Sequence, residues 1–387
     1  MIDQETEAIV VALKTRTQET SSAIQEVMDS VEWLEKMGVE YYYSKFCSTF
    51  DSTPEGNIGP ILDSLVEYFK EPYSILAPSL PVNGRTVEDG HLYVNGQPLH
   101  KSSMRNHPLT PMWSNDIAEL MKDQSKYPVY TIRRTELLED QWQITQNKLE
   151  NYMQTHKHFY LVPDFIDDKD GELIAQRFSH LKVLSGGSGL LEFTGKQLAS
   201  LTTMELKDTL SPKTDALPIL VAGSSSEQTL KQIAEYEGNG GLSYKVYPEK
   251  LDEGIQDIAT IMNWAEKNQS KPILIYASAS KEERENTRDI PNIAQILEDL
   301  LADVVKRMVK KGRKGVIVAG GETSGAVMKT LDLNSFIVSE SVAPGVPVLI
   351  PTEDKEMRVV LKSGNFGGKD FFTQAIKKIG KGSFNNG

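Results

Sequence analysis

A glycine-rich turn between an apolar run and a predicted helix is the segment whose residue types most clearly suit a chemical task. Its residues are Gly320, Gly321, Glu322, Thr323 and Ser324. Glycine lets the backbone approach a ligand closely, and hydroxyls and N–H groups at a helix N-terminus attract an anion. The pattern suits a nucleotide phosphate. It lacks the Gly-Lys-Ser/Thr of a P-loop, however, and a capped strand–helix turn would contain the same residues.

Two more loops in the same half of the chain resemble this turn. One follows the apolar run 218–222 and contains Ser224 and Ser226, and the other follows the run 358–361 and contains Gly364. Taken alone, the serines suit a helix cap and the glycine suits a wide turn. Three such loops, each following a predicted strand, favour a single nucleotide pocket.

The first half of the chain offers a different kind of polar loop. Residues 45–59 include Lys45, Asp51 and Ser52 among many hydroxyl and amide side chains. Such a group can bind the hydroxyls of a sugar-like ligand, and a lysine can pair with its carboxylate or with a phosphate. Asp51 could act as a general base or hold a metal ion. A turn with Asx and Ser/Thr caps is the structural alternative.

Composition narrows the class of ligand. The 42 basic and 54 acidic residues of the 387 give a net charge of −12, and the pI is about 5.2. This acidic balance argues against DNA or RNA as a partner, because phosphate backbones require a basic surface. A small anion needs only local donors, and Arg85 and Arg105 are cations that clamp carboxylates or phosphates.

Other classes of site are disfavoured by missing patterns. The single Cys47 can form neither an internal disulfide nor a structural zinc site. The sequence has no clustered metal-ligand spacing, no Gly-x-Ser-x-Gly elbow and no dinucleotide fingerprint after its first strand. It also has no apolar stretch near the roughly 20 residues that span a bilayer, so we expect a cytoplasmic protein.

Short apolar runs alternate with longer amphipathic stretches along the whole chain. This alternation predicts an α/β protein with mostly parallel sheets covered on both faces. The polar segment 201–216 reads as a linker, so we expect two tandem α/β domains, 1–200 and 217–387, with an interdomain cleft that holds the site. An Asn95-Gly96 pair predicts a type I′ hairpin within 91–99.

The predicted strands and helices follow this alternation. The predicted strands are 8–14, which we expect to be buried, and 39–46, 73–77, 129–132, 158–162, 181–184, 218–222, 243–247, 272–276, 315–319, 346–350 and 358–361. The predicted helices are 20–37, 58–69, 139–155, 171–180, 227–236, 255–267, 293–309 and 370–379.

Taken as a set, these loops and their neighbours resemble the four-carbon acid sugar kinase family, most closely its 3-oxo-tetronate kinase branch. The resemblance covers nearly the whole chain in the family's order. Its motifs are KFCSTFDSTPEGNIGP (45–60), LAPSLPVNGRTVEDGHLYVNGQPL (76–99), MRNHPLTPM (104–112), LSGGSGL (184–190), GSSSEQT (223–229), VAGGETSGAV (318–327) and LKSGNFG (361–367).

The resemblance implies an N-terminal domain that binds a sugar acid and a C-terminal domain that binds ATP. It implies ATP- and Mg²⁺-dependent phosphorylation of the 4-hydroxyl of a 3-oxo-tetronate, with no nucleic-acid or membrane partner and with a homo-oligomer left open. The implied ATP ligands are Ser224, Ser226, Gly320, Gly321, Glu322, Thr323, Ser324 and Gly364. The implied sugar-acid ligands are Lys45, Ser52, Arg85, Arg105 and Asn106, together with Asp51 as a base or hydroxyl ligand.

One departure from the family concerns the catalytic base. Family members open with a strand that ends in Asp-Asp-Phe-Thr-Gly-Ala, and an acid of that motif is the expected base or substrate ligand. This sequence lacks the motif, and its Met1 falls near the family's second strand, which leaves Asp51 as the substitute. The alternative function is therefore that of a truncated relative, which binds ATP and phosphorylates slowly or not at all.

Overall fold

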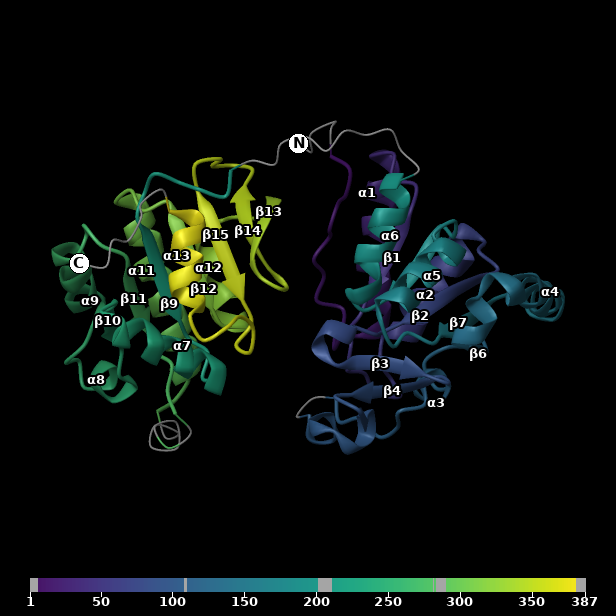
Figure 1. Ribbon diagram of the computed structural model, residues 1–387. Helices are drawn as coiled ribbons and strands as arrows, with labels where there is room; N and C mark the ends of the chain where they lie inside the picture. The colour runs from purple at the N-terminus through teal and green to yellow at the C-terminus, as the bar shows by residue number, and fades with distance from the viewer. Residues whose placement is uncertain (1–5, 108–109, 201–210, 281, 283–289, 381–387) are drawn as a thin grey trace. The chain divides into compact units, whose positions relative to one another are not determined.

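The chain divides into two compact units, Met1–Glu205 and Leu206–Gly387. The computed structural model in Figure 1 describes residues 6–107, 110–200, 211–280, 282 and 290–380. Each unit contains a mostly parallel sheet with helices between its strands, so the predicted α/β class is confirmed. Residues 201–210 of the predicted linker lie outside the described residues.

The first unit is built on a five-stranded parallel sheet of order β1-β8-β2-β7-β6. Its strands are β1 (Tyr42–Lys45), β2 (Tyr73–Ala77), β6 (Val129–Ile132), β7 (Phe159–Pro163) and β8 (Val183–Gly186). Its helices are α1 (Thr20–Lys36), α2 (Ile58–Phe69), α3 (Ile117–Met121), α4 (Glu139–Thr155), α5 (Asp168–Phe178) and α6 (Gly189–Ser200), with short 3-10 turns η1 (Pro81–Asn83), η2 (Leu99–Lys101), η3 (Ser103–Asn106) and η4 (Arg134–Leu137).

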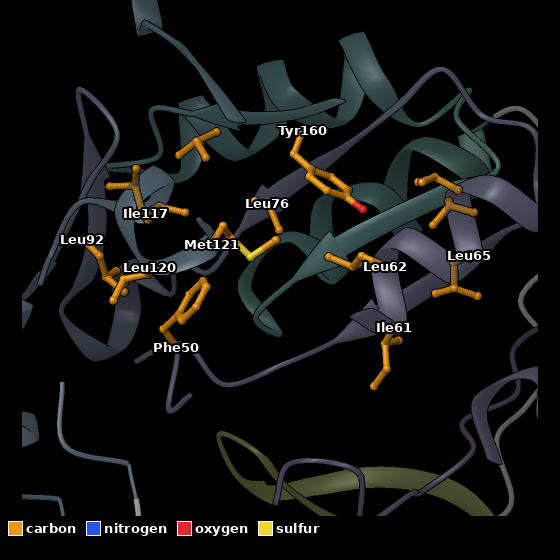
Figure 2. Close-up of a cluster of buried hydrophobic side chains, with 14 of the residues drawn as sticks. Phe50, Ile61, Leu62, Leu65, Leu76, Leu92, Ile117, Leu120, Met121 and Tyr160 are labelled. Atoms are coloured by element: carbon orange, nitrogen blue, oxygen red, sulfur yellow. The ribbon is translucent and has the colours of Figure 1, made fainter. Parts of the chain in front are cut away.

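Alternate residues of β2 explain why this sheet is covered on both faces. Leu76 packs into a cluster with apolar residues of α1, α2 and α3, whereas Ile75 and Ala77 pack into a second cluster with α4, α5 and α6. Figure 2 shows the first cluster, in which Phe50 and Tyr160 are the largest labelled side chains. A strand buried on both faces has a mostly apolar sequence, as residues 73–77 do.

A small antiparallel sheet interrupts the first unit. It consists of β3 (Arg85–Glu88), β4 (His91–Val94) and β5 (Gln97–Pro98). The turn between β4 and β5 has positive φ at both Asn95 (+51°) and Gly96 (+76°), as a type I′ turn requires. The predicted hairpin is therefore confirmed, while β3 was not predicted.

The second unit is built on a seven-stranded sheet of order β10-β11-β9-β12-β15-β14-β13. Its strands are β9 (Pro218–Ala222), β10 (Leu242–Lys245), β11 (Ile273–Tyr276), β12 (Gly315–Ala319), β13 (Phe336–Ala343), β14 (Val346–Pro351) and β15 (Arg358–Lys362). Its helices are α7 (Glu227–Gly238), α8 (Pro248–Asp252), α9 (Ile258–Lys267), α11 (Ile293–Lys310), α12 (Gly321–Leu331) and α13 (Phe371–Ile379).

This second sheet also buries both faces. Ile219 and Val221 of β9 pack with α9, α11 and α12, whereas Leu220 and Ala222 pack with α7 and α13. Five neighbouring strands, β10, β11, β9, β12 and β15, run parallel. At the β15 edge, β14 pairs antiparallel with β15, and β13 pairs antiparallel with β14. Strand β13 was not predicted, because its exposed positions interrupt the apolar pattern.

The prediction of a buried strand at 8–14 is wrong. This segment has no regular secondary structure, and Val10 is 86% exposed. A strand is stable only where a neighbour accepts its backbone hydrogen bonds. Among the described residues, the edge strand β1 pairs with β8 alone. The apolar composition supplied a tendency toward a strand but not the partner that a strand needs.

One helix begins later than predicted, and the cap explains why. The range 255–267 becomes α9, which starts at Ile258 because the Asp257 carboxylate accepts a hydrogen bond from Thr260 N at 2.7 Å. Ile255 itself is 62% exposed and lies between α8 and this cap.

Candidate functional site

The three glycine- and serine-rich loops of the second unit emerge next to one another. Strands β9, β12 and β15 are neighbours in the sheet and run parallel, with Ala222 opposite Ala319 and Ala319 opposite Lys362 at their ends (Figure 1). The loops that follow them therefore leave from one edge of the sheet. In open α/β sheets, ligands bind outside this carboxyl edge.

These loops approach so closely that side chains larger than glycine do not fit at the points of contact. A Cβ atom added to Gly223 would lie 2.2 Å from Thr323 Oγ1, and one added to Gly364 would lie 2.4 Å from Ser224 Oγ. Gly320 has φ +130° and lies against the backbone N of Ser224, so it needs glycine for its conformation as well. The structure thus brings together the loops that the sequence singled out in this unit.

Hydroxyl groups join the first of these loops to the third. Ser226 Oγ donates to the Gly364 carbonyl at 2.7 Å and accepts a hydrogen bond from Thr229 N at 3.2 Å as the N-cap of α7. Ser224 Oγ lies 3.3 Å from Ser226 Oγ. Ser226 is therefore the N-cap of α7, which is the alternative role that the sequence suggested for it. The same hydroxyl also holds the Gly364 loop in place.

The second loop forms the N-terminus of α12. Gly321 and Glu322 are exposed there, whereas Thr323 is buried against the first loop. The N–H groups of a helix's first turn have no partner within the helix, so they can bind an anion. The Ser324 hydroxyl donates back to the Gly320 carbonyl at 2.6 Å.

Negative charge also gathers beside this helix terminus. Burial raises the pKa of Glu298 on α11, and the neighbouring carboxylates of Glu322 and Asp299 raise it further. Glu298 and Glu322 thus interact electrostatically beside the α12 N-terminus. Carboxylates are among the ligands that Mg²⁺ takes in proteins.

Sequence reasoning missed a buried residue that holds the third loop. Lys362 Nζ donates to the Gly364 carbonyl at 2.9 Å and to Thr229 Oγ1 at 3.0 Å. Burial lowers the pKa of Lys362 to about 8. The signal that could have revealed it is a lysine at the end of the apolar strand run 358–362, in a sheet covered on both faces.

In the first unit, loops also meet at the carboxyl ends of neighbouring strands. Tyr43 on β1 donates through its hydroxyl to the Gly187 carbonyl at 2.6 Å. A Cβ on Gly187 would lie 2.6 Å from the Pro78 carbonyl, and one on Gly189 would lie 2.3 Å from the Ser79 carbonyl. The glycine-rich turn after β8 therefore packs against the loop after β2.

Asp51 and Ser52 are buried in the loop after β1. Asp51 has φ +44°, accepts a hydrogen bond from Thr49 Oγ1 at 2.6 Å and forms an ion pair with Arg16 at 3.2 Å. Ser52 Oγ donates to Gln124 Oε1 at 3.2 Å. A non-glycine residue in the left-handed region is strained, and such strain is often found at functional sites.

The other sugar-acid candidates are not joined to this loop. Lys45 is exposed at the end of β1, and Arg105 and Asn106 are exposed on η3. Arg85, at the start of β3, donates to the Asn83 carbonyl, and its Nε atom is buried without a partner. Within the described ranges, no hydrogen bond or ion pair links these four residues to Asp51.

Two further properties bear on the classes of site. In the part of the chain that the structure describes, no three or more His, Cys, Asp or Glu side chains gather where they could hold a metal ion. A search of the same residues for a helix long and apolar enough to span a membrane finds none.

Comparisons with known proteins agree with this division of the chain. Residues 1–194 match the sugar-binding N-terminal domain of a protein family, and residues 219–372 match its nucleotide-binding C-terminal domain. A Brucella melitensis protein named 3-oxo-tetronate kinase is 34% identical over 96% of this chain and 86% of its own. The chain belongs to the four-carbon acid sugar kinase family.

Other members of the family match over a similar length. A Cupriavidus necator protein, also named 3-oxo-tetronate kinase, is 31% identical over 97% of this chain and 88% of its own. The crystal structure of a Haemophilus influenzae protein, 30% identical, gives a TM-score of 0.82 and covers 95% of this chain and 89% of that chain. The resemblance seen in the motifs is therefore confirmed, and so is the fold.

Proposed function

We propose that the chain is an ATP-dependent kinase that phosphorylates the 4-hydroxyl of a 3-oxo-tetronate. The observation that carries this proposal is the convergence of the loops 223–226, 320–324 and 363–367 at one edge of the nucleotide-binding domain. The similarity to proteins named 3-oxo-tetronate kinase supports the class of acceptor.

On the nucleotide side, we assign the phosphates to the N-terminus of α12. The free N–H groups of Gly321, Glu322 and Thr323 supply donors and the positive end of the helix dipole. Ser224 and Gly364 lie in the adjoining loops, which glycine allows to approach each other closely. Positioning and charge neutralisation of this kind account for most of the catalysis in phosphoryl transfer.

On the acceptor side, we assign Asp51 as the general base. It takes the proton of the 4-hydroxyl as that oxygen bonds to the γ-phosphorus of ATP and the bond to the leaving ADP breaks. The cations Lys45, Arg85 and Arg105 bind the substrate carboxylate, and Ser52 and Asn106 bind its hydroxyls. The unpartnered Nε of Arg85 is a buried donor that such a carboxylate would satisfy.

The residues at α12 also fit a Mg²⁺ ion that accompanies ATP. Magnesium usually takes one or two carboxylates together with phosphate oxygens and water. Glu322, in the first turn of α12, offers this type of ligand beside the helix terminus, and Glu298 interacts with it electrostatically. When bound, the ion would neutralise charge on the phosphates.

Nucleotide binding without efficient phosphoryl transfer is the second candidate function. It is favoured by the exposed and unpaired segment 8–14, an apolar run without a neighbouring strand among the described residues. A first domain in which this apolar run stays unpaired would position its substrate poorly. The two candidates differ in turnover and not in ATP affinity.

A coupled ADP-release assay tests the proposal. The protein is given ATP, Mg²⁺ and 3-oxo-tetronates of the erythronate and threonate series, each with its non-oxidised acid as a control. We expect ADP release only with a 3-oxo acid, and a phosphate on its C4 oxygen in the product. ATP binding with no ADP release from either series would instead support the second candidate.

A further inference from the structure

Lys362 is a buried cation behind the three loops of the second unit. It is the last residue of β15, and it is only 2% exposed. Its backbone carbonyl accepts a hydrogen bond from Gly320 N at 2.9 Å, so it also adjoins the start of the α12 loop. Lys362 belongs to the motif LKSGNFG (361–367), but the mechanism proposed above gives it no role.

The groups around the Lys362 ammonium accept its hydrogen bonds, but none of them carries a negative charge that would balance its positive charge. Its three N–H groups face Gly364 O at 2.9 Å, Thr229 Oγ1 at 3.0 Å and Ser363 O at 3.2 Å, and the Phe371 ring centroid is 5.7 Å away. All of these groups are neutral, and within the described residues no carboxylate pairs with Lys362. A buried charge is normally paired, because desolvation makes an isolated one costly.

We infer that Lys362 is a positioning residue of the nucleotide site, whose ammonium holds the Gly364 loop against α7 and whose charge is compensated by the phosphates of a bound nucleotide. This inference rests on the nucleotide-binding role proposed above. The missing partner would then be an anion that arrives with the ligand, at the loops that the lysine already supports.

This arrangement predicts that nucleotide binding changes the protonation of Lys362. Burial lowers the pKa of Lys362 to about 8. The groups that face its ammonium are the Thr229 hydroxyl on α7, the Ser363 and Gly364 carbonyls of the following loop and the Phe371 ring on α13, and none of them is charged. A phosphate group nearby favours the charged form and raises this pKa. Nucleotide binding should therefore be accompanied by proton uptake at pH 8 and 9, with almost none through this group at pH 6.5.

The test is calorimetric titration of the full chain with Mg²⁺-ATP in two buffers that differ in ionisation enthalpy, at pH 6.5, 8 and 9. We expect proton uptake in the wild type at pH 8 and 9 and its loss in Lys362→Met, together with roughly 10- to 100-fold weaker binding at pH 7. The matched control Lys369→Met removes an exposed lysine that pairs with Glu235, and it should leave the uptake unchanged.

A second variant keeps the proposal testable if the methionine variant does not fold. Lys362→Arg carries a guanidinium that stays charged, so its ATP affinity should not fall between pH 8 and 9, whereas that of the wild type should. ATP binding with the same proton uptake in wild type and Lys362→Met, or the same pH profile in wild type and Lys362→Arg, would overturn this inference alone. Failure of the wild type to bind ATP at every pH would overturn the proposed nucleotide site and this inference with it.

Discussion

The two units place polar residues after neighbouring parallel strands, but they connect those residues differently. In the second unit, the loops touch one another directly, with Ser226 bonded to Gly364 and Gly223 against Thr323. In the first unit, Asp51 is buried and bonded to Thr49 of its own loop and to Arg16, whereas Arg105 lies exposed on the separate 3-10 turn η3.

The difference follows from what each ligand requires. Phosphates are bound largely by backbone N–H groups, which the sheet and the helix termini place without help from side chains. A sugar acid is recognised by side chains that each must point at a particular hydroxyl or carboxylate oxygen. Such a site depends on the route of the irregular chain between strands, here the segment that contains β3, β4 and η3.

The largest expected effect concerns Asp51 in the first unit. Asp51→Asn keeps the size of the side chain and tolerates the left-handed backbone, but it removes the base. We expect turnover in the ADP-release assay to fall about 100- to 10,000-fold, with the ATP dissociation constant unchanged. Asp123→Asn, an exposed aspartate of the same unit, is the control. Retention of full turnover by Asp51→Asn would remove Asp51 from the chemistry.

A backbone substitution in the second unit comes next. Gly320→Ala forces a side chain onto a residue at φ +130°, next to the backbone of Ser224. We expect ATP affinity to fall at least about tenfold and stability to fall by about 1–3 kcal/mol. Gly325→Ala, in the same helix, meets nothing within 4 Å and should be neutral or slightly stabilising. Equal ATP affinity in the two variants would show that the turn at Gly320 does not touch the nucleotide.

Arg105 tests whether the exposed cations of the first unit belong to the site. Arg105→Ala should weaken sugar-acid binding roughly 10- to 100-fold, because a charge-assisted contact is lost, and should leave ATP affinity unchanged. The control is Lys101→Ala, which removes an exposed cation from the neighbouring turn η2. Titration with the sugar acid and separately with ATP distinguishes the outcomes. An equal loss of ATP affinity would move Arg105 to the nucleotide side.

The smallest effect separates capping from binding. Ser226→Ala and Asp257→Ala each remove an N-cap of the second unit, from α7 and α9 respectively, and each should lower stability by about 1 kcal/mol. Only Ser226 also holds the Gly364 carbonyl, so only Ser226→Ala should weaken ATP binding as well. Thermal unfolding and ATP titration of both variants measure the two effects. Unchanged ATP affinity in Ser226→Ala would show that this serine caps α7 but does not contribute to ATP binding.

Much of the fold could be predicted from the sequence because strands that are buried on both faces have short, mostly apolar sequences. Strands β2, β6, β9 and β12 begin and end where the runs do. The segment 8–14 shows the limit of this reasoning, since it has the composition of a strand and Val10 is nevertheless exposed. Which strand a segment pairs with depends on the whole sheet and cannot be predicted from the sequence of that segment alone.

The candidate nucleotide site was more predictable than the sugar-acid site for the same physical reason. A loop's place after a parallel strand is enough to predict that Ser224, Gly320 and Gly364 lie at one edge. Nothing in the spacing of Lys45 and Arg105 says how far apart their side chains lie. Lys362 was missed because a lysine at the end of a strand is usually exposed, and its burial depends on α7 and α13 closing over it.

The most direct test of the account is ATP binding by the second unit alone. A fragment of residues 211–387 contains the seven-stranded sheet, both of its apolar clusters and all three loops. Isothermal titration with Mg²⁺-ATP should give an affinity close to that of the whole chain, and a Gly320→Ala fragment should lose it. A fragment that is folded by circular dichroism yet has no affinity up to about millimolar ATP would contradict the account.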